Sequence, residues 1–151
     1  MKKIIISVTT DLISDQRVHK MCTTLHNSGY DVLLVGRKLN NDFISKRPYS
    51  VKRFNLIFRR GFLFYMFFNI RLFIFLLFNK CDIFYSNDLD TLLPNFIISK
   101  IKNKPLVYDS HELFTEVPEL IEKKIVKSFW VFLEKKIFPK LSNVITVSDS
   151  I

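Results

Sequence analysis

Short runs of apolar, β-branched residues alternate along this chain with stretches of helical periodicity, and no other feature constrains the fold as strongly. A continuous apolar run of about 4–8 residues is typical of a parallel strand that is covered on both faces. Such runs predict strands at residues 3–9, 31–36, 51–57, 81–86, 105–109 and 143–147. Strands that alternate with helices form right-handed βαβ units. The sequence therefore predicts an α/β fold, a Rossmann-like three-layer sandwich with a mainly parallel sheet.

Helices are predicted between several of these strands. Ser14 is a suitable N-cap for the first helix, and Asp15 then lies in its first turn, near the positive end of the helix dipole. Gly29 is placed to end that helix. Residues 89–102 and 118–140 predict two further helices, the latter with an amphipathic pattern and a proline in its first turn.

Length and glycine content exclude several classes of protein. The chain has 151 residues, enough for one well-packed domain, so we assign residues 1–151 to a single domain. Its three glycines, Gly29, Gly36 and Gly61, are too scattered for a dinucleotide-binding or phosphate-binding loop, which disfavours nicotinamide dehydrogenases and P-loop nucleotidases. The two cysteines form no C-x-x-C pair and fit reduced thiols of a cytoplasmic protein. The apolar run near Met1 is shorter than the roughly 7–15 residues of a signal peptide core.

Ten of the 16 phenylalanines fall between Phe54 and Phe84, and residues 61–78 are almost entirely apolar. Three explanations are open: a transmembrane span, a crossover helix whose inner face is core, and a helix that lies on a membrane surface. A span of roughly 20 apolar residues is marginal here, and crossing a bilayer would split the predicted sheet. We favour a peripheral membrane contact, because basic side chains at helical spacing can reach anionic headgroups. The expected contact residues are Arg60, Phe64, Phe67 and Arg71.

The formal net charge of +9 suggests an anionic partner. No nucleic-acid-binding motif is present and the arginines lie among apolar residues, so we expect an anionic membrane surface rather than nucleic acid.

Polar residues follow three of the predicted strands. In a parallel sheet the carboxyl ends of the strands share one edge, where ligands bind. Thr10 follows the first strand, Asn87 and Asp88 follow the fourth, and residues 109–112 follow the fifth. Three ionisable groups within residues 109–112 exceed what a turn requires.

Four segments resemble one known family. They are residues 14–18 with Leu25 and Gly29, residues 85–92, residues 108–114 and residues 145–148. In this order they are similar to the opening and to the fourth-, fifth- and sixth-strand segments of glycosyltransferase family 4. The resemblance implies the N-terminal, acceptor-side half of a GT-B enzyme, in which two Rossmann-like domains face each other across a cleft.

The resemblance also implies an activity. Such enzymes transfer a sugar from a nucleotide-sugar donor with retention at the anomeric carbon, without an active-site metal or a cofactor. The donor is bound by a C-terminal domain, which is expected to be absent here because the chain stops at Ile151. We therefore expect the chain to be inactive alone. Many relatives act on lipid-linked or envelope glycans at the inner face of the cytoplasmic membrane, which would suit the phenylalanine-rich segment.

Most site residues follow from the matched motifs, and Thr10 follows from its place after the first strand. The expected catalytic residues are His111, Asp88 and Glu112. The expected substrate-binding residues are Asp15, Arg17, Thr10, Asn87, Asp109 and Ser110. Residues 9–13 replace the glycine-rich loop that many relatives carry, which departs from the family pattern. Two other functions remain open: a non-catalytic binding or membrane-docking module, and a sugar-nucleotide epimerase of related architecture.

Overall fold

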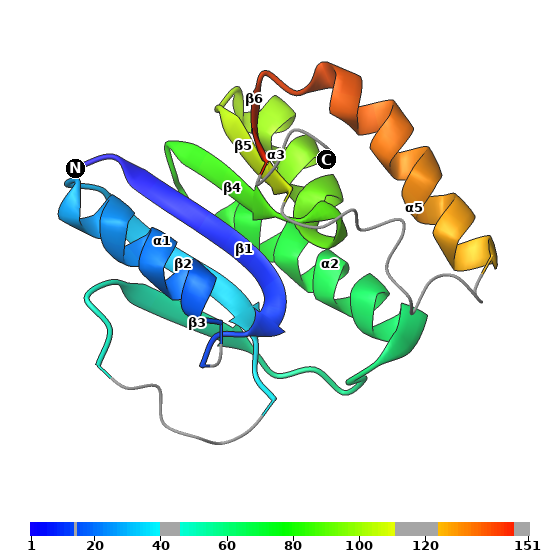
Figure 1. The fold of residues 1–151 in the computed structure, drawn as a ribbon, viewed down its shortest axis with the longest axis horizontal. Helices are drawn as coiled ribbons and strands as arrows, with labels where there is room; N and C mark the ends of the chain where they lie inside the picture. Colours follow the sequence, from blue (N-terminus) through cyan, green and yellow to red (C-terminus); the bar gives the residue numbers. More distant parts are fainter. Residues whose placement is uncertain (14, 40–45, 111–123, 147–151) are drawn as a thin grey trace.

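A six-stranded parallel β-sheet forms the centre of the protein (Figure 1). The computed structural model describes residues 1–13, 15–39, 46–110 and 124–146. The strands lie in the order β3-β2-β1-β4-β5-β6, and every described pairing is parallel. Their bounds are β1 Lys3–Asp11, β2 Asp31–Arg37, β3 Ser50–Phe54, β4 Ile83–Asn87, β5 Leu106–Ser110 and β6 Asn143–Thr146. The predicted α/β, Rossmann-like class is confirmed.

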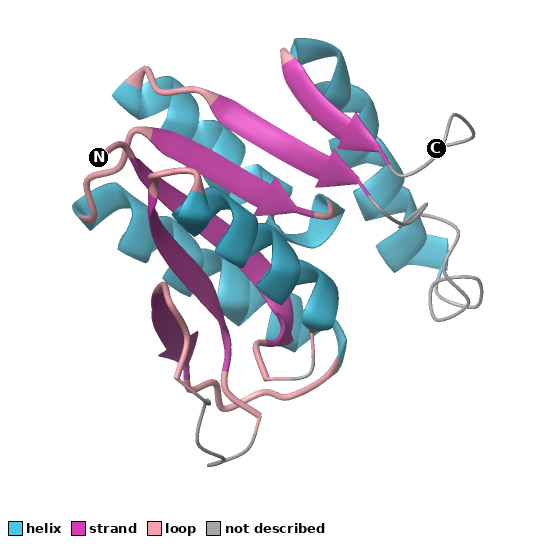
Figure 2. Ribbon diagram, turned by 60° about the vertical axis from the view of Figure 1, so that its left-hand side comes forward, coloured by secondary structure: helices cyan, strands magenta, loops and turns pink. Residues whose placement is uncertain are grey.

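Helices cover both faces of the sheet (Figure 2). On one face lies α1 (Gln16–Asn27), and on the other lie α2 (Gly61–Phe78), α3 (Leu92–Lys102) and α5 (Lys124–Ile137). Two short 3₁₀ helices, η1 (Leu89–Thr91) and η3 (Phe138–Lys140), adjoin α3 and α5. The arrangement has three layers, as predicted.

Two hydrophobic clusters hold the helices on the sheet. Successive residues of a strand point to opposite faces, so the apolar run of β1 can serve both clusters. Ile4 and Ile6 pack with Val18 and Cys22 of α1, whereas Ile5 packs in the larger cluster beneath α2, α3 and α5. This double burial explains why the strand is continuously apolar instead of alternating.

Several element boundaries differ from the prediction by a few residues: β1 runs on to Asp11 and β4 begins at Ile83, and two further differences have a clear cause. The third strand ends at Phe54 instead of residue 57, because β2, the strand it pairs with, ends at Arg37, opposite Phe54. The first helix is capped by Asp15, whose carboxylate accepts a hydrogen bond from the Val18 amide at 3.0 Å, so Asp15 precedes the first turn instead of lying in it. Ser14, the predicted cap, lies outside the described residues.

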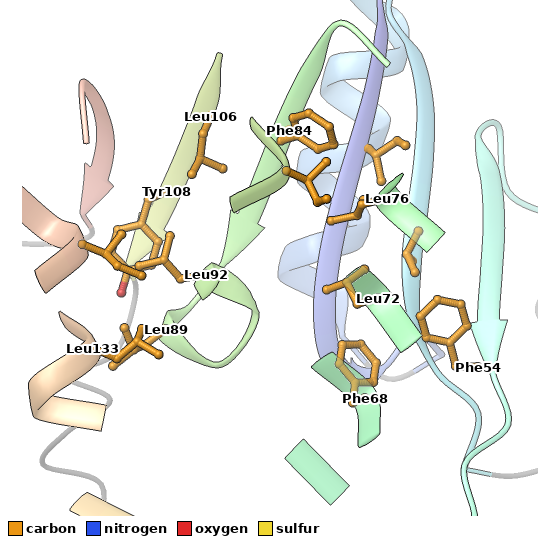
Figure 3. Packing of buried hydrophobic residues seen from close by; sticks show 14 of the residues in the cluster. Phe54, Phe68, Leu72, Leu76, Phe84, Leu89, Leu92, Leu106, Tyr108 and Leu133 are labelled. Atoms are coloured by element: carbon orange, nitrogen blue, oxygen red, sulfur yellow. The ribbon is translucent and has the colours of Figure 1, made fainter. Parts of the chain in front are cut away.

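The phenylalanine-rich segment forms α2, a crossover helix between β3 and β4. Its inner face is a stripe of side chains spaced four residues apart, Phe64, Phe68, Leu72 and Leu76, all buried against the sheet. Figure 3 shows Phe68, Leu72 and Leu76 in the buried cluster that also contains Phe54 of β3. The ring centroids of Phe54 and Phe68 lie 5.8 Å apart. Phe64 is 3% exposed, so the expectation that it contacts a membrane is wrong: the ring points into the protein, and the Arg37 guanidinium covers it at 4.8 Å.

By length and composition α2 could also cross a bilayer, and it is the one candidate span found within the described part of the chain. The strands on either side of it, β3 and β4, belong to one sheet. A membrane crossing would place them on opposite sides of the bilayer, so the transmembrane alternative disagrees with the structure.

Candidate functional site

The carboxyl ends of β4 and β5 bring together most of the predicted polar residues that lie within the described chain. Asn87 is opposite Asp109 in the strand register, and the Asp88 amide donates a hydrogen bond of 2.9 Å to the Asp109 carbonyl. Ser110 continues β5 at the same edge. Strand order reverses between β1 and β4, which is where open parallel sheets bind ligands.

Asp88 has an unusual backbone conformation. Its φ of 64° and ψ of 170° lie in a region that residues with a side chain rarely adopt. The conformation turns the chain sharply from β4 into η1 and leaves the Asp88 side chain half-buried at the sheet edge. Strain of this kind costs about 1–3 kcal/mol and tends to occur at functional sites.

The Asp109 carboxylate binds the side chains of Arg17 and Tyr85. Its side chain is 4% exposed, and one carboxylate oxygen accepts a hydrogen bond of 2.8 Å from Nη2 of Arg17. The other oxygen accepts one of 2.8 Å from the Tyr85 hydroxyl. The Arg17 side chain is 41% exposed, so it lies between the buried carboxylate and solvent. Arg17 and Asp109, predicted to bind substrate separately, therefore bind each other.

Tyr85 is a hydrogen-bond donor at this site across the physiological pH range. Burial raises its pKa strongly, and the negative charge of Asp109 raises it further. The phenol therefore keeps its proton and keeps donating to the Asp109 carboxylate.

Thr10 and Asp15 form a second local pair beside the end of β1. The Thr10 hydroxyl donates to the Asp15 carboxylate at 2.9 Å, and Asp15 also caps α1. These contacts account for both residue types at these positions and fix the start of α1 against β1.

A buried polar network between β1 and β4 was missed by the sequence reasoning. The Thr91 hydroxyl contacts the Ser86 hydroxyl at 2.8 Å and donates to the carbonyls of Asn87 and Ser7 at 3.0 and 3.2 Å. Asn95 donates to the Thr91 carbonyl at 2.8 Å. The available signal was that these polar residues interrupt segments that are otherwise apolar enough to be core.

A second part of this network reaches α2. The Thr9 hydroxyl donates a hydrogen bond to the buried Asp90 carboxylate, and the side-chain amide of Asn69 donates one of 2.9 Å to the Asp90 backbone carbonyl. Asn69 is one of two strongly polar residues in α2, and this contact explains its presence on a phenylalanine-rich helix. The network fixes η1, and with it the turn that carries Asp88.

Two predicted catalytic residues, His111 and Glu112, lie outside the described residues. Among the described residues, no cluster of three His, Cys, Asp or Glu side chains has metal-binding geometry. The site that the structure does describe is a hydrogen-bonding edge of carboxylates, amides and hydroxyls. Such groups bind the hydroxyls of a polar ligand and can accept a proton from one.

Comparison with known proteins extends this description. The model of Glycosyltransferase Family 4 matches residues 15–151. No curated protein matches the chain. The six-stranded parallel sheet with its helices matches the N-terminal half of GT-B glycosyltransferases.

Three solved structures illustrate the likeness. The sucrose-phosphate synthase of Thermosynechococcus elongatus has a TM-score of 0.65 and 13% identity, over 97% of this chain and 48% of that one. HepE of Anabaena, in complex with UDP and glucose, has a TM-score of 0.56 and 16% identity over 95% and 38%. The UDP-GlcNAc 2-epimerase of Methanocaldococcus jannaschii has a TM-score of 0.53 and 12% identity over 97% and 39%. This chain thus spans less than half the length of each of these structures, and identities this low establish the fold alone.

Proposed function

Because this chain belongs to glycosyltransferase family 4, we propose that it is the acceptor-side, N-terminal domain of an enzyme that transfers a sugar from a nucleotide-sugar donor to a glycan or lipid-linked acceptor. The donor would bind a C-terminal domain across the cleft, and the 151-residue chain alone would not turn over. The transfer would proceed with retention at the anomeric carbon, without a metal or a cofactor, in the cytoplasm.

The turn at Asp88 is the observation that carries this proposal. It places a half-buried carboxylate in a strained conformation at the carboxyl edge, next to the strand that leads to His111. A carboxylate so placed can orient an acceptor hydroxyl and accept its proton, provided that it comes within about 2.6–3.2 Å of it. The ion pair between Arg17 of α1 and Asp109 of β5 then holds the end of β5 in place, and the two side chains are not direct ligands.

The network behind the turn supports the same function. Thr91 holds three groups of β1 and β4, and Asp90 is anchored by Thr9 and Asn69. Hydrogen bonds of this kind behind the turn keep a reacting carboxylate in position, which a transferase requires and a non-catalytic binding module does not.

A transfer assay tests the proposal. The gene product that carries this chain is incubated with UDP-, GDP- and dTDP-sugars and an extract of membrane glycolipids, and nucleotide release and labelled product are measured. We expect transfer with one donor class, the same rate in EDTA, and a product with the donor's anomeric configuration. Asp88→Asn should lower kcat by about 100-fold or more, the usual range for losing a general base.

Asp31→Asn is the matched control, because Asp31 is an exposed aspartate at the amino end of β2, the opposite edge of the sheet. It should leave kcat unchanged. Activity that survives Asp88→Asn would remove Asp88 from the mechanism. Release of an epimerised nucleotide sugar without an acceptor would establish the epimerase alternative, and no reaction with any donor would favour the non-catalytic module.

A further inference from the structure

The outward face of α2 is apolar along its whole length. Opposite the buried stripe lies a second stripe, here called the outer stripe, with helical spacing and exposures between 37% and 51%. Its members are Leu63, Phe67, Ile70, Ile74 and Leu77. An 18-residue helix is about 27 Å long, so the outer stripe is far larger than a scattered surface residue.

Neighbouring helices extend this apolar surface. α2, α3 and α5 lie side by side in one layer over the same face of the sheet (Figure 1). Ile97 and Ile101 of α3 are 36% and 61% exposed, and Phe132 of α5 is 60% exposed. The outer surface of this layer therefore presents large apolar side chains from three helices.

The same layer is strongly basic. Within the described helices α2, α3 and α5, Glu134 is the single acidic residue. The cationic residues of these helices are Arg71, Lys100, Lys102, Lys124, Lys127, Lys135 and Lys136. The acidic side chains of the described carboxyl edge, by contrast, lie on the strands and turns. Charge is thus separated between the outer layer and the site.

Cations and aromatic rings are paired on this surface. The Lys136 ammonium lies 5.8 Å from the centre of the Phe132 ring, and that of Lys100 lies 5.5 Å from the centre of the Phe96 ring. Along α5, a shallow hollow of about 540 Å³ is lined by lysines and apolar side chains. Its described lining is Lys124, Lys127, Ser128, Val131, Phe132 and Lys135. A hollow with apolar side chains at its base and ammonium groups around it can bind a lipid, with the phosphate headgroup on the lysines and the acyl chain on the apolar side chains.

We propose that the outer layer of α2, α3 and α5 docks on the surface of a bilayer containing anionic phospholipid, with α2 parallel to the membrane plane. The outer stripe enters the headgroup region, and the lysines of α5 contact lipid phosphates. The proposal depends on this surface alone and stands or falls independently of the sugar-transfer reaction.

Charge favours a membrane over a second copy of the chain. A two-fold dimer through this layer would bring together two surfaces of the same positive charge, with one acidic residue on each set of described helices, and like-charge contacts across an interface cost free energy. An anionic bilayer presents the complementary charge together with an apolar phase that accepts the outer stripe.

The structure also changes which residues make the contact. Arg71 donates a hydrogen bond of 2.6 Å to the Asn55 carbonyl and lies 5.1 Å from the centre of the Phe54 ring, so it is held toward β3. Phe64 is buried. Of the contact residues expected from the sequence, Phe67 lies in the outer stripe and Arg60 precedes α2 as an exposed N-cap.

Vesicle co-sedimentation tests the docking. The 151-residue chain is mixed with vesicles of phosphatidylcholine alone and with vesicles containing 30 mol% phosphatidylglycerol, at low and high salt. We expect partition onto the anionic vesicles that weakens as salt rises. Ile70→Gln with Ile74→Gln, and separately Lys135→Glu with Lys136→Glu, should each weaken partition by about tenfold or more.

Matched controls separate docking from general charge and hydrophobicity. Lys20→Glu with Lys46→Glu makes the same change in net charge at two exposed positions outside α2, α3 and α5, and Lys20 lies on α1, which covers the opposite face of the sheet. Val144→Gln with Ile145→Gln makes the same chemical change on β6, where both residues are 37–45% exposed. Both control pairs should retain the wild-type partition, and far-UV circular dichroism should show that every variant is folded.

Three results overturn the proposal. If the folded wild-type protein does not bind anionic vesicles, the membrane is not the partner of this surface. A dimer that is seen in light scattering and lost in the α2 variant would then show that the surface binds a second copy of the chain. Equal loss in the control pairs would show non-specific adsorption. If the α2 variant does not fold, the α5 charge pair alone decides, and its unchanged partition counts against docking.

Discussion

The ion pair between Arg17 and Asp109 should stabilise the fold measurably, and its removal gives a sharp test of how the site edge is held. Arg17→Met keeps most of the side-chain volume and the helix propensity but removes the guanidinium. The buried Asp109 carboxylate then loses its bond to the guanidinium and keeps the hydrogen bond from the Tyr85 hydroxyl.

The expected magnitude follows from the exposure of the two groups. A hydrogen bond to a charged group contributes about 1.5–3 kcal/mol when it is desolvated. Because the Arg17 side chain is 41% exposed, solvent screens part of this, and about 1–2 kcal/mol is expected for Arg17→Met. For a domain of this size that corresponds to a fall in Tm of about 3–6 °C.

Urea unfolding followed by circular dichroism measures the change. Lys20→Met, an exposed lysine on the same helix, is the matched control and should change stability by less than about 0.5 kcal/mol. A double-mutant cycle of Arg17→Met with Asp109→Asn isolates the pair energy. If Arg17→Met and Lys20→Met change the free energy of unfolding by the same amount within error, the ion pair does not stabilise the end of β5.

Three further predictions follow from particular residues. Asp88→Gly should raise the free energy of unfolding by about 1 kcal/mol in thermal unfolding, because glycine adopts a φ of 64° without strain. The same change should lower transfer activity, because it removes the carboxylate. A lower stability would contradict the strain at Asp88. Gly36→Ala should destabilise by about 1–3 kcal/mol, since the new Cβ would lie 2.5 Å from Cδ2 of Leu12. Leu12 is buried, so Leu12→Ala is itself destabilising, but in urea unfolding the double variant should lose less stability than the sum of the two single losses. An unchanged midpoint for Gly36→Ala would refute this. Burial raises the pKa of Cys22 to about 12 and of Cys81 to about 11, so neither thiol should react with Ellman's reagent at pH 8 until the protein unfolds. The buried neutral thiols should stabilise the fold fully below the ordinary thiol pKa of 9.0. As the pH rises above 9.0 the thiols of the unfolded chain ionise first, so this stabilisation is lost. Urea midpoints that do not fall between pH 9 and 11 would contradict this expectation.

The parallel sheet could be predicted because its strands are buried on both faces, which gives each of them an unbroken apolar run. The helix over residues 61–78 was less accessible to sequence reasoning. Its two faces are equally apolar, so the pattern does not distinguish the side that packs on the sheet from the side that faces outward. Phe64 and Phe67 look equivalent in the sequence, and only their placement against Arg37 and β3 separates a core ring from an exposed one.

Part of the site was predictable for a similar reason. Asn87, Asp88 and Asp109 follow strands, and parallel strands place their carboxyl ends at one edge. The pairing of Arg17 with Asp109 was not predictable, because it joins residues 92 positions apart through a helix orientation that spacing does not encode. The network of Ser7, Thr91 and Asn95 was missed because small polar residues in apolar segments look like tolerated substitutions until their hydroxyl and amide partners are known.

The position of β1 in the middle of the sheet also sets the order in which the chain can assemble during synthesis. β1 pairs with β2 early, but its other edge pairs with β4, and the Lys3 amide bonds to the Asp82 side chain 79 positions later. The 29 positions that separate Phe54 from Ile83 take about 1.5–6 s to be synthesised. During that interval a nascent chain presents an open strand edge, and α2, whose two faces are both apolar, emerges before its place on the sheet is complete. A chaperone or a membrane surface that shields α2 during those seconds would therefore favour folding over aggregation.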